Sequence, residues 1–165
     1  MTASHSPTLV IGVGNEYRGD DGAGIAVARL LRNQLPSHVR ILEQSGEGTS
    51  LLDSWRAAAS VVLVDAVQSG AAPGTIHRFD ASQAPVPAGL FPCSTHAFGV
   101  AEAIEMARAL HELPSRMVVY GIEGADFADG NGLSPAVQRA VAQVAAQVGR
   151  ELRNSSDIER RQEAK

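Results

Sequence analysis

Two adjacent acidic residues in the stretch "VIGVGNEYRGDDGAG", Val10–Gly24, are the first candidates for chemistry. An apolar run enters a glycine turn, and Asp20 and Asp21 follow where a helix can begin. A carboxylate about 4 Å from a bound phosphate would repel it by roughly 4 kcal/mol per charge pair at an effective dielectric of about 20. The dinucleotide fingerprint also fails because Tyr17 takes the third glycine position, and the P-loop fails because the two aspartates replace Lys and Ser/Thr. The turn therefore favours a cation over a nucleotide.

Asp65 is the second candidate because it lies near the end of "SVVLVDAV", Ser60–Val67, a run that is apolar on both faces. A carboxylate at the end of a buried strand needs a hydrogen-bond partner or a cation to offset its desolvation. Structural roles stay open for these acids. Asp20 or Asp21 could cap a helix, and Asp65 could accept a hydrogen bond from a loop amide.

His96, in "CSTHAFG", lies near the start of an expected helix and supplies the third candidate side chain. Two carboxylates and one imidazole form a mixed oxygen and nitrogen set that suits a first-row divalent cation such as nickel, copper, zinc or iron. Cys93 precedes His96 by three residues and offers an alternative reading as a nucleophile or thiolate ligand. Glycine-rich surroundings predict that Glu123, Asp126 and Asp129 are solvated.

The elements that must position these residues alternate between strand and helix patterns. The expected strands are Thr8–Val13, His38–Gln44, Ser60–Val67, Thr75–Ala81 and Arg116–Gly124. Four helices are expected. The first runs from Asp20 or Asp21 to about Leu35, the second lies within Gly46–Ala58, and the third runs from Thr95 to Leu110. The fourth begins at Pro135, after a cap at Ser134, and runs to about Leu152.

This order predicts an α/β fold, a three-layer α/β/α sandwich on a five-stranded, mostly parallel sheet. One strand should be antiparallel, because the turn before Thr75–Ala81 is too short for a helical crossover. Residues 1–153 should form one domain, followed by a polar, mobile tail over residues 154–165. Ligands of such sheets bind at the carboxyl ends of the strands where the strand order reverses, which places Asn15–Asp21 beside Asp65.

Composition narrows the class of protein further. The 165 residues carry a net charge of −4 and no basic block outside the C-terminal tail, so no nucleic-acid partner is expected. A single cysteine excludes an internal disulfide and favours the cytoplasm. Apolar runs are too short for membrane insertion, and the N-terminus lacks the features of a signal peptide.

The motifs "GVGNEYRGDDGAG", "VLVDAV", "STHAFG" and "GLSPAV" together resemble those of the hydrogenase maturation endopeptidases. The resemblance extends from Leu9 to about Leu152. It implies an endopeptidase that removes the C-terminal extension of the precursor of a [NiFe]-hydrogenase large subunit after nickel insertion. It also implies that Asp21, Asp65 and His96 bind a metal, that nickel is supplied by the substrate without an organic cofactor, and that the protein is a monomer.

The same resemblance assigns substrate handling to an acidic residue after the second strand. The matching segment, "EQSGEGTSLL", places Glu43 and Gly46 there, although the side chain is longer and the first glycine of the family's turn is missing. No protein nucleophile is assigned. Three alternatives stay open: a non-enzymatic nickel carrier or adaptor, a stand-alone metallopeptidase, and a cysteine peptidase that uses Cys93.

Overall fold

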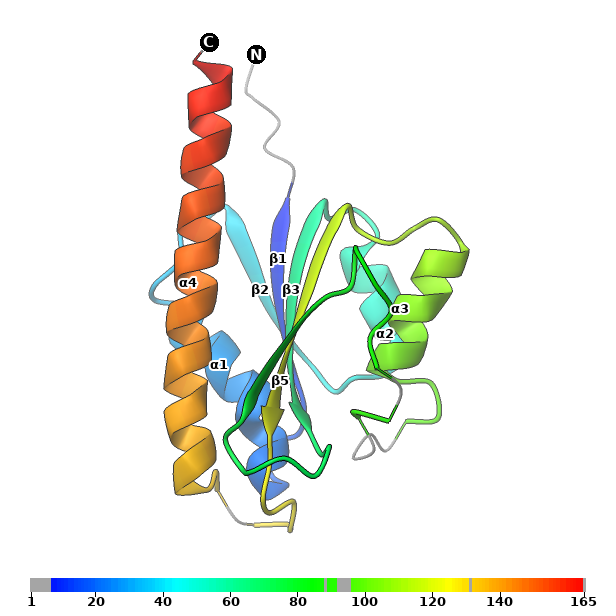
Figure 1. Cartoon of the computed structure of the whole chain (residues 1–165), viewed down its shortest axis with the longest axis vertical. Helices are drawn as coiled ribbons and strands as arrows, with labels where there is room; N and C mark the ends of the chain where they lie inside the picture. Colours follow the sequence, from blue (N-terminus) through cyan, green and yellow to red (C-terminus); the bar gives the residue numbers. More distant parts are fainter. Residues whose placement is uncertain (1–6, 88, 92–95, 131, 165) are drawn as a thin grey trace.

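The computed structural model describes residues 7–87, 89–91, 96–130 and 132–164 (Figure 1). Cys93 lies outside these residues. The strands are β1 (Thr8–Val13), β2 (Val39–Gln44), β3 (Ser60–Val67), β4 (Ile76–Asp80) and β5 (Arg116–Glu123). The helices are a 3₁₀ turn η1 (Gly19–Gly22), α1 (Ala23–Leu31), α2 (Gly48–Trp55), α3 (Val100–Ala109) and α4 (Pro135–Glu163).

The five strands form one sheet in the order β2-β1-β3-β5-β4. Strands β2, β1, β3 and β5 run parallel to their neighbours, while β4 pairs antiparallel with β5. Both the mostly parallel sheet and its single antiparallel strand are thus confirmed. The chain places β2 on one side of β1 and β3 on the other, so the strand order reverses between β1 and β3, as predicted.

Helices cover both faces of the sheet, with α1 and α4 on one face and α2 and α3 on the other (Figure 1). Alternate strand residues divide between two cores, as the period of two in a strand requires. Val10, Val62 and Val64 pack beneath α1 and α4. Leu9, Ile11 and Leu63 pack beneath α2 and α3. The three-layer α/β/α sandwich is therefore confirmed.

A glycine lets the turn after β1 fold tightly against η1. Gly14 has a φ of +143°, a conformation that side-chain-bearing residues rarely adopt, and a Cβ atom there would lie 1.9 Å from the backbone oxygen of Asp21. The amide of Asn15 donates to that same oxygen at 3.2 Å. The close approach brings Asp21 back over the carboxyl end of β1.

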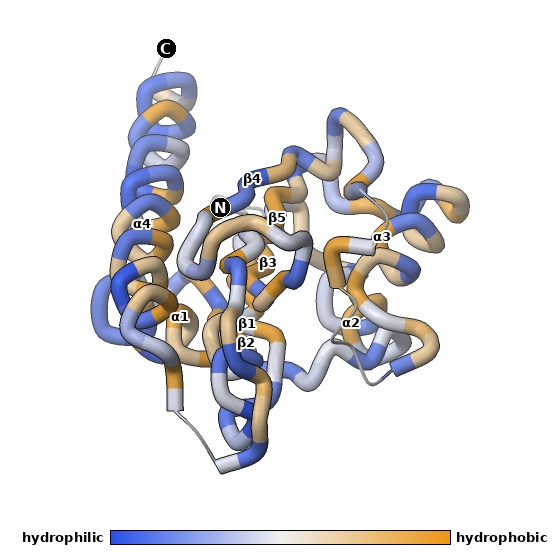
Figure 2. The backbone as a smooth tube through the Cα atoms, turned by 60° about the horizontal axis from the view of Figure 1, so that its bottom comes forward, coloured by the Kyte–Doolittle hydropathy of each residue, from blue (hydrophilic) through white to orange (hydrophobic). Residues whose placement is uncertain are grey.

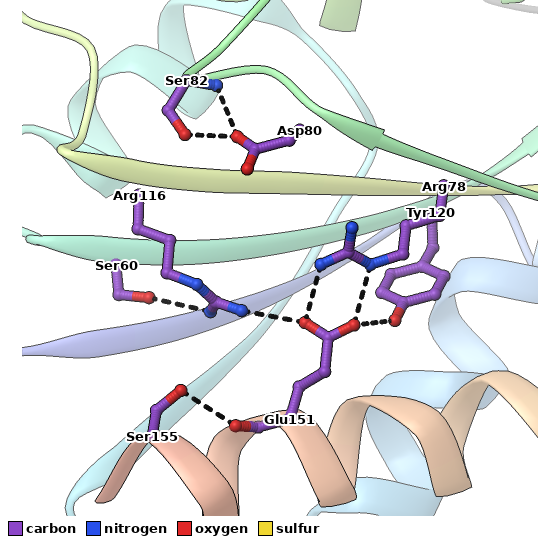
Figure 3. Close-up of polar contacts among 8 residues, drawn as sticks. All are labelled: Ser60, Arg78, Asp80, Ser82, Arg116, Tyr120, Glu151 and Ser155. Carbon is purple, nitrogen blue, oxygen red and sulfur yellow. Dashed lines mark hydrogen bonds and ion pairs between the residues drawn. The ribbon is translucent and has the colours of Figure 1, made fainter. Parts of the chain in front are cut away.

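In addition to its apolar packing, the long helix α4 binds the sheet through the carboxylate of Glu151 (Figure 3). Arg78 of β4 donates to it through Nε at 2.8 Å, Arg116 of β5 through Nη2 at 2.9 Å, and the hydroxyl of Tyr120 also donates to it. Burial, together with this carboxylate, raises the pKa of Tyr120 to about 12. These contacts bind α4 to the two strands at the β4 edge.

Four of the expected helix boundaries are wrong. Helix α1 begins after η1 with Gly22 at its N-cap, has no side-chain cap, and ends at Leu31 rather than near Leu35. Helix α3 begins at Val100 instead of Thr95. Helix α4 continues past Leu152 to Glu163, because residues 153–163 contain no glycine or proline to end it.

The extension of α4 is mostly hydrophilic, as the blue end of the helix in Figure 2 shows. Within it, the hydroxyls of Ser155 and Ser156 donate to the carbonyls one turn back, those of Glu151 and Leu152. Within the described part of the chain, no helix combines the length and the apolar character needed to cross a lipid bilayer.

Candidate functional site

Asp21, Asp65 and His96 line one small cavity of about 80 Å³ at the carboxyl ends of β1 and β3. We call this cavity the acid pocket. Asp21 reaches it from η1, Asp65 from the end of β3, and His96 from the segment before α3. The structure therefore brings together three side chains that lie far apart in the sequence. Their role as metal ligands remains a prediction.

Asp65 is the most strongly perturbed side chain of the acid pocket. It is 7% exposed, and its Oδ1 atom accepts a hydrogen bond from the amide of Ala66 at 2.8 Å. Burial is the main cause that raises its pKa well above the usual value, and the negative charge of Asp21 adds to the effect. One amide donor does not offset these effects, so the pocket favours either a proton or a cation at Asp65.

Asp21 is also partly buried, but it is more exposed to solvent than Asp65 and has one basic neighbour. Burial raises the pKa of its carboxyl group, and the charge of Arg18, whose Nη1 atom lies 3.9 Å from Oδ2, opposes that rise. Arg18 also lines the acid pocket. The sequence analysis missed Arg18, although it lies within the same motif and precedes Asp21 by about one helical turn.

Two hydrogen bonds on the C-terminal side of His96 hold the segment that carries it. The carbonyl of Phe98 accepts a hydrogen bond from the amide of Gly48 at the start of α2, at 2.9 Å. The amide of Gly99 donates to Glu102 in the first turn of α3 at 3.2 Å. His96, two residues before Phe98, is partly exposed where it lines the acid pocket.

The acid pocket is not arranged as a complete metal centre. Among the described residues, no group of three or more His, Cys, Asp or Glu side chains is close enough to hold a metal ion. The three side chains nevertheless offer two carboxylates and an imidazole to one cavity, and this donor set fits a first-row divalent ion.

The two residues assigned to substrate handling occupy different positions. Gly46 lines the acid pocket, where its φ of +93° and the 2.9 Å approach that its Cβ would make to Val13 both favour glycine. Glu43 lines the neighbouring hollow rather than the acid pocket. Its carboxylate accepts from Arg29 at 2.6 Å and from Arg32 at 2.7 Å.

Asp20 has a structural role that differs from helix capping. Its side chain is fully buried and accepts hydrogen bonds from the amides of Ala125, Asp126 and Ser134 at 2.8, 3.0 and 2.7 Å, and from the Ser134 hydroxyl at 2.9 Å. Ser134 occupies the N-cap position of α4, but its hydroxyl binds Asp20 instead of capping the helix. Asp20 thus links η1 to the loop between β5 and α4.

The prediction that Glu123 is solvated is wrong, because its side chain is buried. Its carboxylate accepts from the amides of Ser69 and Gly70, from the Ser69 hydroxyl and from the ring of His77. Burial would raise the pKa of Glu123, but these hydrogen bonds outweigh that effect and lower it. Glu123 therefore anchors the loop after β3 and is satisfied without a ligand.

The burial of Asp65 predicts that the Asp65→Asn variant is more stable than the wild type without metal at neutral pH. The pKa of Asp65 is raised in the folded state, so ionisation destabilises the fold once the pH exceeds the unfolded-state value of about 4. We expect a rise in Tm of roughly 2–8 °C, which corresponds to about 1–2 kcal/mol for a chain of this size. Thermal denaturation from pH 4 to 8 measures the effect. The difference should vanish at the acid end, and a difference that is independent of pH would contradict the assignment.

Comparison with known proteins gives a consistent result. Residues 25–151 match the model of the family described as hydrogenase maturation protease. The hydrogenase expression/formation protein HupD of Rhodobacter capsulatus is 33% identical over 148 residues, which are 88% of this chain and 70% of the relative. HupD of Thiocapsa roseopersicina is 29% identical over 136 residues, or 81% of this chain and 62% of the relative. The chain thus spans about two thirds of the length of these relatives.

The hydrogenase maturating endopeptidase HybD from E. coli has a similar structure, with a TM-score of 0.76 and 27% identity. The superposition covers 90% of this chain and 93% of HybD. The family match includes Asp65 and His96 and begins just after Asp21, while the structural similarity extends over almost the whole chain. On this evidence the chain belongs to the hydrogenase maturation protease family.

Proposed function

We propose that the protein is an endopeptidase that removes the C-terminal extension of a [NiFe]-hydrogenase large-subunit precursor after nickel insertion. The observation that carries this proposal is the meeting of Asp21, Asp65 and His96 in one cavity of a chain that belongs to this family. In this proposal nickel is part of the substrate, so the protein recognises an ion that the precursor already holds.

The chemistry of the acid pocket supports recognition of a cation that arrives with its own ligands. Carboxylates and neutral imidazole both bind nickel. The entry of a divalent ion would favour the ionised form of Asp65 and Asp21, because the ion offsets the charge that burial disfavours. A precursor without nickel would leave these carboxylates uncompensated. Nickel loading would therefore act as a checkpoint for processing.

The ion can contribute to peptide-bond hydrolysis in two ways. It can polarise the carbonyl of the scissile bond, or it can activate a water molecule as the nucleophile. In both cases Asp21, Asp65 and His96 orient the ion against the bond, and Gly46 lines the cavity beside them.

Mass spectrometry of a nickel-loaded and a nickel-free large-subunit precursor, each incubated with the purified protein, tests this function. We expect only the nickel-loaded precursor to lose mass, through one cut near its C-terminus. An unchanged precursor mass with transfer or retention of nickel would indicate a carrier or adaptor. Cleavage of small peptides without any precursor would indicate a stand-alone metallopeptidase.

The cysteine peptidase alternative is tested in the same assay, because Cys93 is the only cysteine of the chain. Alkylation with iodoacetamide should leave processing unchanged, whereas a nucleophilic cysteine would be inactivated. The proposal also includes a monomer acting in the cytoplasm, a compartment that keeps a lone thiol reduced.

A further inference from the structure

Two further hollows continue the acid pocket across the surface, the first adjoining it and the second adjoining the first. The first, which we call the ion-pair pocket, shares Gly14, Asn15 and Ser45 with the acid pocket. The second, which we call the apolar groove, has a volume of about 500 Å³ and shares Glu16, Ile25 and Arg29 with the ion-pair pocket. Because each hollow shares residues with the next, the three hollows form a connected series.

The charged side chains that line the ion-pair pocket, Glu16, Arg29 and Glu43, are joined by hydrogen bonds. Arg29 donates to both carboxylate oxygens of Glu16 at 2.6 and 3.1 Å and to Glu43 at 2.6 Å, and Arg32 also binds Glu43. Both carboxylates of the wall are thus paired with arginines, one of which, Arg32, lies outside the pocket lining. Such a surface attracts neither strongly acidic nor strongly basic side chains, but it offers hydrogen-bond donors and acceptors to a peptide main chain.

The apolar groove lies between α1 and α4, two helices that run beside each other on one face of the sheet (Figures 1 and 2). Its apolar wall comes from both helices and from the residue before the N-cap of α4. Ala26 and Leu30 belong to α1, and Leu133 and Val141 lie on the other side. Leu30 is 42% exposed, and Tyr17 in the ion-pair pocket is 75% exposed. A concave surface lined mainly by apolar side chains is typical of a binding site.

We infer that the precursor lies as an extended chain along these three hollows. The scissile bond lies at the acid pocket, the main chain crosses the ion-pair pocket, and an aliphatic or aromatic side chain fills the apolar groove. This inference rests on the proposed endopeptidase function. The substrate of an endopeptidase continues beyond the cut bond and therefore needs surface next to the reactive cavity. Continuity with the acid pocket favours the precursor over a second copy of the chain, which would cover the approach to that cavity.

A matched pair of variants tests the apolar groove. Leu30→Lys places a charge in the groove near the C-terminal end of α1, where a cation is compatible with the helix dipole. Leu110→Lys makes the same change at the C-cap of α3, at a leucine that is 55% exposed and lies outside the three hollows. With nickel-loaded precursor, Leu30→Lys should raise KM about tenfold and leave kcat within about twofold. Leu110→Lys should change neither constant.

A photo-crosslinking residue, p-benzoylphenylalanine, at position 30 identifies the occupant of the groove directly. We expect a crosslink to the precursor, mapped by mass spectrometry to the segment beside the cut bond. A crosslink to a second copy of the chain, or to a distant part of the precursor, would overturn the inference. This measurement does not depend on the kinetic variants, so a folding defect in Leu30→Lys cannot decide the result.

The proposed function and the proposed docking along the apolar groove can be disproved separately. If the wild-type protein does not shorten any nickel-loaded precursor, the proposed function is wrong. If the wild type cuts the precursor but Leu30→Lys has wild-type KM, or position 30 does not crosslink beside the cut bond, only the docking along the apolar groove is wrong.

Discussion

Asp65→Asn and His96→Ala should each reduce the processing of a nickel-loaded precursor by more than about a hundredfold. Loss of residues that merely orient metal ligands already costs about 10–100-fold, and these two side chains are proposed as ligands themselves. Asp65→Asn is the sharper test, because we expect it to leave the fold intact and to raise its stability. A variant that is more stable and inactive would separate a functional carboxylate from a structural one.

The matched controls for this experiment are Asp53→Asn and His111→Asn. Asp53 and His111 are exposed and lie outside the acid pocket. His111 has a φ of +57°, which asparagine tolerates well. Both controls should process the precursor at the wild-type rate. A second readout is binding of the nickel-loaded precursor, which should weaken in Asp65→Asn and His96→Ala. Full processing by either of these two variants would remove the metal role of that residue.

The convergence of Asp21, Asp65 and His96 follows from rules that can be applied to the sequence. Parallel strands that alternate with helices place their carboxyl ends at one edge of the sheet. Asp21 follows β1 and Asp65 lies near the carboxyl end of β3, and these two strands are neighbours. Gly46, after β2, reaches the same cavity for the same reason. His96 follows no strand, and only its motif indicated where it would lie.

The roles of the other acids could not be predicted, because they depend on contacts between distant segments. The partners of Asp20 lie 105 to 114 residues away along the chain. Glu123 is buried because the loop after β3 folds back over its carboxylate. A local pattern of glycines and acids is typical of a solvated loop, so neither contact leaves a signal in the composition.

Helix ends were predicted less well than strands because several ends are set by tertiary contacts. Ser134 has the residue type and position of a cap, yet a buried carboxylate from another segment binds its hydroxyl. Helix α3 begins at Val100, just after Phe98, whose carbonyl accepts a hydrogen bond from the amide of Gly48 in α2. By contrast, Ser60–Val67 was predicted with its exact bounds, because a long apolar run between polar segments is a strong strand signal.

Asp20→Ala should lower the free energy of unfolding by at least about 3 kcal/mol. The substitution leaves four donors without their acceptor, three amides and the Ser134 hydroxyl, and each buried unsatisfied donor costs about 1–3 kcal/mol. For a chain of this size, Tm should fall by roughly 6–12 °C. Thermal and urea denaturation measure the change, and Asp20→Asn, which keeps one acceptor oxygen, should be destabilised less.

The pH dependence of the stability lost in Asp20→Ala identifies the ionised carboxylate as the source of that stability. Burial would raise the pKa of Asp20, but the hydrogen bonds from Ser134, Ala125 and Asp126 together outweigh burial and lower it. The stabilisation is therefore present above the unfolded-state value of about 4 and is lost as the pH falls through the lower folded-state value. A simple helix cap would contribute only about 0.5–2 kcal/mol. A loss in that smaller range, or one that does not change with acid pH, would mean that Asp20 acts locally on η1 and does not link it to the loop before α4.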